Sequence, residues 1–198
     1  YLTAQLLEMG KNLVVALNMM DEAEKRELKF DLKALSESLG VPVIATVAHK
    51  GNGRKEILKA ATRAIENKAV YANPLTYNEN VTHHIEHMEE ILQGHKLPFP
   101  LKWSAIKIIE GDSHVLDFLR KSELDKDLIG EIEQFLKYHS SDSFELEIVD
   151  SRYAFANWVA DRSVTRPEVE VVTLTDKIDK ILINKYLGIP IFALIMLL

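Results

Sequence analysis

The sequence predicts an α/β unit with a parallel sheet, followed by an all-α helical bundle and an apolar helix at the carboxyl end. Two apolar runs, at residues 13–17 and 41–45, each lead into a polar loop, and an amphipathic pattern lies between them. From about residue 71 to residue 164 the apolar positions follow helical spacing without strand-like alternation. The last thirteen residues carry no charge. These observations divide the chain into three kinds of structure.

The first part alternates helices and strands. Its predicted elements are a helix over residues 1–9, a strand over 13–17, a helix over 31–39, a strand over 41–45 and a helix from residue 54. In the middle helix Leu32, Leu35 and Leu39 share one face, and Gly40 ends it. A strand, helix, strand order is typical of a parallel sheet, in which ligands bind at the carboxyl ends of the strands.

Polar residues follow both predicted strands at that edge. Asn18 and Asp21 come directly after the first strand, in the pattern Asn-x-x-Asp. An Asp carboxylate can accept two hydrogen bonds from the ring N–H and amine of guanine, which adenine does not offer, and an Asn amide can serve the carbonyl side and tie neighbouring loops together. The pattern also occurs in helix caps and turns, so this alternative stays open.

The middle of the chain reads as a second, all-helical unit. Helices are predicted over residues 76–92, 101–110, 114–121, 125–138 and 144–162. In the last of these, Leu146, Val149, Tyr153 and Ala156 are predicted to form the packed face. Glu110 and Asp112 form either an acid pair or a cap for the next helix, and the cap is favoured. Residues 165–173, with Pro167, are predicted to be an extended linker.

The uncharged carboxyl end follows three lysines, Lys177, Lys180 and Lys185. A spanning helix needs about 20 apolar residues. We expect the beginning of a transmembrane helix here, with the lysines on the cytoplasmic side, and keep a buried terminal helix as the alternative.

The composition excludes several classes of function. The formal charge is −6 with a pI near 5.7, so no basic field indicates a nucleic-acid partner, and the absence of cysteine removes thiolate chemistry and disulfides. No signal-peptide pattern is visible. His83, His84 and His87 invite a metal interpretation, but a solvated helix face is favoured, and we assign no metal site.

Several segments together resemble one family, the bacterial ferrous iron transport protein B (FeoB). They are YLTAQLLEMG at residues 1–10, VVALNMMDEA at 14–23, WSAIKIIEGD at 103–112, SRY at 151–153, TDKID at 175–179 and LGIPIF at 187–192. The resemblance covers nearly the whole chain in the expected order. It implies residues 1–70 as the carboxyl-terminal part of a GTPase domain, 71–164 as a helical domain, 165–175 as a linker and 176–198 as the start of the first transmembrane helix.

The resemblance also implies the ligands. The nucleotide-binding residues are then Asn18, Met19, Asp21, Thr46, Val47 and Ala48, and the Ala48 N–H would reach the guanine carbonyl. Met19 stands where many GTPases have lysine. We expect the loss of that lysine to weaken nucleotide binding and to speed nucleotide exchange. The sequence contains no G-x-x-x-x-G-K-[ST] phosphate loop, so the fold class is a partial P-loop GTPase-like sheet. We expect this chain to contact the guanine base of GTP or GDP, but not to supply ligands for Mg²⁺. This chain alone is predicted not to hydrolyse GTP.

The expected setting is the cytoplasmic side of the bacterial inner (plasma) membrane, with the rest of the transporter, membrane lipid and guanine nucleotide as partners and no nucleic acid. A homo-oligomer of the parent protein stays open. The alternative function is a membrane-tethered helical interaction module derived from another GTPase class, without a transport role.

Overall fold

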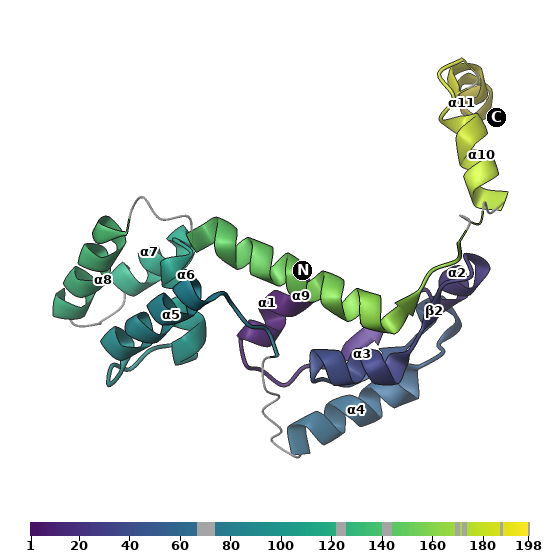
Figure 1. Cartoon of the computed structure of the whole chain (residues 1–198). Helices are drawn as coiled ribbons and strands as arrows, with labels where there is room; N and C mark the ends of the chain where they lie inside the picture. Colours follow the sequence, from purple (N-terminus) through teal and green to yellow (C-terminus); the bar gives the residue numbers. More distant parts are fainter. Residues whose placement is uncertain are drawn as a thin grey trace.

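The structure is a computed structural model that describes residues 1–66, 74–121, 126–139, 144–168, 171, 174–186 and 188–197. An α/β part and a helical bundle lie at opposite ends of one long helix, α9 (Phe144–Ser163), and two further helices extend from the end beyond it (Figure 1). Both predicted parts are therefore present.

The α/β part is built on two short parallel strands. Strand β1 (Val15–Leu17) pairs with β3 (Val43–Ala45), with Val15 opposite Val43. The crossover helix α3 (Leu32–Leu39) begins at Asp31, whose carboxylate accepts the N–H groups of Lys33 and Ala34, and ends at Gly40, where φ is 69°. Helices α1 (Leu2–Glu8) and α4 (Arg54–Glu66) complete this part. Its buried apolar core comprises Leu7, Leu35, Leu39, Val41, Val43 and Val159.

Between β1 and α3 the chain forms two elements that the sequence did not predict. Helix α2 (Met20–Lys25) follows β1 after two residues, and strand β2 (Lys29–Phe30) follows α2. Strand β2 pairs antiparallel with β4 (Val164–Thr165), the continuation of α9. The boundary expected between residues 164 and 165 thus falls inside a strand, so Thr165 is paired rather than part of a linker. The boundary expected between residues 70 and 71 lies outside the described residues.

Four helices and the first turns of α9 form the bundle. They are α5 (Glu79–Leu92), α6 (Leu101–Ile109), α7 (Ser113–Lys121) and α8 (Lys126–Tyr138). Asp112 accepts the N–H groups of His114 and Val115, so its predicted capping role is confirmed. The predicted start of α8 at residue 125 lies outside the described residues. The buried core comprises Val81, Ile85, Met88, Leu92, Ala105, Ile106, Ile108, Ile109, Val115, Leu119, Leu128, Ile132, Phe135, Phe144 and Ile148.

The packed face of α9 differs from the predicted one. Leu146 and Tyr153 are 65% and 54% exposed, so the prediction that they pack into the bundle is wrong. The buried residues of α9 are instead Phe144, Ile148, Arg152, Val159 and Ser163. The sequence pattern missed this stripe because an arginine stands at its centre.

Arg152 is fully buried at the point where the α/β part meets the bundle. Its guanidinium donates two hydrogen bonds to Glu8 of α1, at 2.8 and 2.9 Å, and two to Glu110 after α6, at 2.6 and 3.1 Å. Tyr77 donates its hydroxyl to Glu8 at 2.7 Å. A buried guanidinium is tolerated only when its donors are paired, and here two carboxylates from different parts of the chain supply the acceptors. This network joins the two parts of the molecule.

Beyond β4 lie α10 (Leu174–Leu182) and α11 (Gly188–Leu197). They project away from the other elements at the carboxyl end (Figure 1), and Asp176 of α10 pairs with Arg26 at 2.9 Å. Among the residues that the structure describes, no helix has the length and hydropathy needed to cross a bilayer. The expected start of a transmembrane helix is therefore not confirmed, and its residues 187 and 198 lie outside the described ranges.

Candidate functional site

The loops that follow β1 and β3 lie side by side at the carboxyl edge of the parallel pair. The Thr46 N–H donates to the carbonyl of Leu17 at 2.8 Å, and the Met20 N–H donates to the carbonyl of Thr46 at 3.2 Å. The six residues predicted to contact a nucleotide therefore fall on two adjoining loops. Parallel strand pairing produces this arrangement, because it brings the carboxyl ends of β1 and β3 to one edge.

Asn18 connects the two loops. Its Oδ1 accepts the N–H of Ala48 at 3.0 Å and the hydroxyl of Thr46 at 3.2 Å. The prediction that Asn18 ties neighbouring loops together is confirmed. Because a backbone N–H must face the side-chain oxygen, Nδ2 of Asn18 points elsewhere and can donate to a ligand. The Ala48 N–H, expected to reach a guanine carbonyl, donates to Asn18 in this structure.

Met19 has a left-handed backbone, with φ at 62°, and its side chain is 61% exposed. A side chain other than glycine in this region carries strain of about 1 kcal/mol. Met19 precedes α2 and brings Asp21 into the first turn of that helix. The bend after β1 therefore leaves an apolar side chain free beside the loop of Asn18.

Asp21 is held by the second loop rather than by Asn18. Its Oδ1 accepts the N–H of Glu22 at 3.1 Å, whereas Oδ2 pairs with Lys50 Nζ at 2.9 Å and lies 3.5 Å from His49 Nε2. The hydrogen bond from Lys50 holds the pKa of Asp21 below its ordinary value. The sequence contains no signal for this pair, since the two residues are 29 positions apart.

Two glycines shape the turn that carries Lys50. A single 3₁₀ turn, η1 (Ala48–Lys50), ends at Gly51, where φ is 74°. Gly53 has a φ of 82°, and a Cβ there would lie 2.5 Å from the carbonyl oxygen of Ala45. Val47 and Asn52 close the loop with two backbone hydrogen bonds of 3.3 Å. These two glycines therefore shape the turn after β3.

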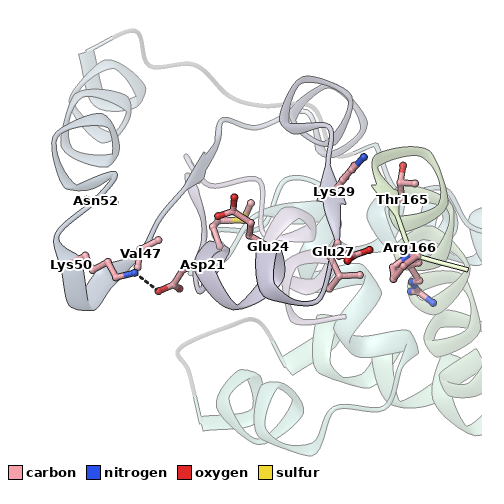
Figure 2. A pocket seen from close by; sticks show the side chains of 12 residues that line it. Asp21, Glu24, Glu27, Lys29, Val47, Lys50, Asn52, Thr165 and Arg166 are labelled. Carbon is pink, nitrogen blue, oxygen red and sulfur yellow. Dashed lines mark hydrogen bonds and ion pairs between the residues drawn. The ribbon is translucent and has the colours of Figure 1, made fainter. Parts of the chain in front are cut away.

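Two hollows flank this junction. Asn18, Thr46 and Ala48 line one of about 410 Å³, together with residues at the start of α4. Asp21 and Val47 line another of about 850 Å³, which Figure 2 shows with Lys50 pointing toward Asp21. The charged residues of the larger hollow include the acids Asp21, Glu24 and Glu27 and the bases Lys29, Lys50 and Arg166. The larger hollow thus offers donors and acceptors to a polar ligand.

Of the three histidines of α5, His84 is half-buried among other rings, whereas His83 and His87 are exposed, as predicted for a solvated helix face. The ring of His84 lies 4.6 Å from those of His139 and Phe144, and its Nδ1 is 2.8 Å from the carbonyl of Asn80. Across the described residues no group of three or more His, Cys, Asp or Glu could hold a metal ion. His83 and His87 likewise lie beside aromatic rings, at 5.4 Å from His84 and 5.7 Å from Phe135.

Two family models match successive parts of the chain. The model described as ferrous iron transport protein B matches residues 1–61, and the model described as the FeoB cytosolic helical domain matches residues 77–165. A fusion protein of Fe(2+) transport protein A and Fe(2+) transporter FeoB from Porphyromonas gingivalis is 34% identical over 99% of the chain. The Fe(2+) transporter FeoB of Escherichia coli is 32% identical over 100% of the chain. The chain spans 24% and 25% of the lengths of these two relatives.

Solved structures with the same arrangement include nucleotide complexes. A mutant NFeoB of S. thermophilus bound to GDP matches 83% of this chain with a TM-score of 0.68 and 29% identity, over 63% of its own length. The cytosolic domain of the T. maritima FeoB iron transporter in its GMPPNP form matches 83% of this chain with a TM-score of 0.67 and 25% identity, over 62% of its own length.

Proposed function

This chain belongs to the FeoB family of ferrous iron transport proteins, and we propose that it supplies the guanine-binding part of a transporter's cytoplasmic GTPase domain. The base is bound by Asn18 and Asp21, and Met19 covers one of its faces. The loop after β3 borders the base on another side with Thr46, Val47 and Ala48. Residues 1–70 belong to the GTPase domain and 71–164 to the helical domain on the cytoplasmic side of the inner membrane. The guanine nucleotides in the related structures support GTP and GDP as ligands.

One observation supports this proposal most strongly. Asn18 accepts hydrogen bonds from both Thr46 and Ala48 through Oδ1, so its Nδ2 is oriented by the protein and has no hydrogen-bond partner among the described residues. Guanine presents acceptors at N7 and O6 and donors at N1 and the exocyclic amine. The Asn18 amide can donate to the acceptors of guanine and the Asp21 carboxylate can accept from its donors, so the two side chains have the chemistry that the base requires.

The proposal is tested by nucleotide binding to the full-length protein that carries this sequence. We expect GDP to bind more tightly than ADP, and Asn18→Ala to weaken GDP binding by about 10- to 100-fold, because ligand and loop hydrogen bonds are lost together. Asn80→Ala, on an exposed position of α5, is the matched control. Equal affinity of the wild-type protein for GDP and ADP would overturn the proposal.

We do not assign GTP hydrolysis to the residues of this chain. The sequence has no G-x-x-x-x-G-K-[ST] segment, whose backbone and lysine position the phosphates. We therefore expect the 198-residue chain by itself to release no phosphate from GTP above background, with or without Mg²⁺. Magnesium-dependent release by the purified chain would contradict this expectation.

We also propose that α11 inserts into a membrane. Its described side chains Phe192, Leu194, Ile195, Met196 and Leu197 are 60–87% exposed, and an apolar surface of this kind is stable only when it is covered. Lys177, Lys180 and Lys185 precede it, as expected for a helix that enters from the cytoplasm. The FeoB match favours this setting over an interaction module without a transport role.

Sedimentation with phospholipid vesicles tests the membrane proposal. We expect the chain to sediment with them and the double variant Phe192→Lys/Ile195→Lys to stay in solution. Leu58→Lys/Ile65→Lys changes two exposed apolar residues of α4 and is the matched control. If both double variants sediment equally, α11 is not the membrane contact.

A further inference from the structure

We propose that Lys50 competes with guanine for the Asp21 carboxylate and thereby sets the affinity and release rate of the nucleotide. This inference rests on the proposed function. Lys50 is then a specificity-determining residue of the guanine site. Without nucleotide, its ammonium occupies the Asp21 carboxylate that would otherwise bind the base. Guanine binding displaces the lysine, and guanine release returns it.

The geometry places Lys50 on the acceptor that the base needs. Both oxygens of Asp21 already have donors, Lys50 Nζ at 2.9 Å on Oδ2 and the Glu22 N–H at 3.1 Å on Oδ1. Asp21 and Lys50 line the same hollow, and Figure 2 shows the ammonium on the side of the carboxylate that faces Val47. A base that takes both oxygens of this carboxylate must therefore replace the ammonium on Oδ2.

The backbone that carries Lys50 is fixed, whereas its side chain can leave. The Lys50 N–H donates to the carbonyl of Val47 at 3.0 Å and the Gly51 N–H to that of Ala48 at 3.0 Å, so the turn directs residue 50 toward Asp21. Gly51 and Gly53 hold the turn in conformations that other residues adopt only with strain. The Lys50 side chain is 54% exposed, so water can receive the ammonium when the base arrives.

The Lys50 side chain is 54% exposed and that of Asp21 is 16% exposed, so water reaches the lysine end of the pair and the expected effect is modest. Ion pairs between exposed side chains stabilise by amounts equivalent to about two- to fivefold in an equilibrium constant. Removing the ammonium should therefore tighten GDP binding by about two- to fivefold and slow GDP release by a similar factor. The base itself gives a second readout. The base of IDP lacks the exocyclic amine and so donates only one hydrogen bond to the carboxylate. The affinity for IDP should therefore rise less than that for GDP.

The test uses the full-length protein and measures the affinities and release rates of GDP and IDP. Lys50→Met and Lys50→Gln remove the charge, Lys50→Arg keeps it, and Lys55→Met removes a nearby exposed charge as the matched control. We expect tighter GDP binding, slower release and a higher GDP-to-IDP affinity ratio for Met and Gln only. Thermal melting of each variant shows whether it is folded.

Further outcomes separate this inference from the proposed function. Unchanged or weaker GDP binding by Lys50→Met would overturn the competition. If Asp21→Asn alters GTP binding while Lys50→Met does not, the guanine site stands and only the role of Lys50 falls. If neither variant alters nucleotide binding, both fall. In the Asp21→Asn background the effect of Lys50→Met should shrink, since it acts through the carboxylate.

Discussion

At the scale of single residues, Arg152 is a fully buried charge that joins three segments of the chain. Its side chain is fully buried, yet it makes paired hydrogen bonds to Glu8 and to Glu110. Burial alone would lower the pKa of this guanidinium, but the hydrogen bonds of Glu110 and Glu8 raise it above its ordinary value. Such a network contributes little net stability compared with an apolar core, but losing one member leaves buried charges without partners.

We therefore predict that Arg152→Met lowers the free energy of unfolding by about 3–5 kcal/mol. Urea denaturation measures this. Arg162→Met, on the exposed surface of the same helix where the guanidinium lies 5.1 Å from the Trp158 ring, should cost under about 1 kcal/mol. Adding Glu8→Gln and Glu110→Gln to Arg152→Met should recover part of the loss, because the buried negative charges that lost the guanidinium are removed. Equal losses for the two arginine variants would contradict this account.

The same network predicts a dependence of stability on pH. Burial acts to raise the pKa of Glu110, but hydrogen bonds from Arg152 and Lys107 outweigh it and hold that pKa below its ordinary value. A carboxyl whose pKa is lowered by folding stabilises the folded state above the unfolded pKa, about 4.3 for Glu, and this contribution is lost as pH falls through the folded pKa. Melting temperature should therefore fall below about pH 4 in the wild type and less steeply in Glu110→Gln. Parallel pH profiles would contradict the assignment.

At the scale of secondary structure, helices with regular apolar spacing could be predicted and irregular ones could not. The periodicity of Leu32, Leu35 and Leu39 was sufficient for α3, and the cap at Asp112 followed from residue type. Helix α2 has six residues and no buried face, and β2 and β4 have two residues each, too few for any period. These elements form because Phe30 of β2 meets Val164 of β4, two residues that are 134 positions apart in the sequence, so the pairing depends on the tertiary structure.

The site was predictable to the same degree. Asn18 and Asp21 could be proposed because their residue types directly follow an apolar strand, and parallel pairing brings Asn18 to the loop of Thr46. Lys50 was missed as a partner of Asp21 because its position depends on the left-handed turn at Gly51 rather than on any spacing. The buried face of α9 was missed because Arg152 has polar chemistry, which indicates exposure unless its acceptors are known.

The α/β part leaves more of its strand edges and apolar side chains exposed than the helical bundle does. Within the described ranges β1 pairs on one side only, with β3, and α4 exposes Leu58 and Ile65 at 59% and 73%. The bundle instead buries a continuous apolar core. In the isolated chain we predict that amides of β1 and β3 exchange with solvent faster than those of α5 and α6, by hydrogen exchange. Equal protection would show that the short sheet is as stable as the bundle.

At the scale of the whole molecule, α9 links the proposed guanine site to the bundle and to the segment that leads toward α11. The β2–β4 pair joins the chain after α2 to the end of α9, and Arg26 joins α2 to Asp176 of α10. The segment after β1, the bundle and α10 are therefore connected by direct contacts. This arrangement has functional meaning only if Asp21 reads guanine.

The most direct test of that central claim is a change of nucleotide preference. In the full-length protein, Asp21→Asn replaces an acceptor with a donor that faces the guanine N1–H, so GTP affinity should fall by about 30- to 1000-fold. Xanthine carries a carbonyl in place of the amine and should recover part of the loss. Titrations of Asp21→Asn and of the exposed control Asp150→Asn with GTP and XTP measure both effects. The account predicts preference for XTP in Asp21→Asn alone; unchanged GTP affinity in that variant would mean that residues 18–21 form only a strand-ending turn.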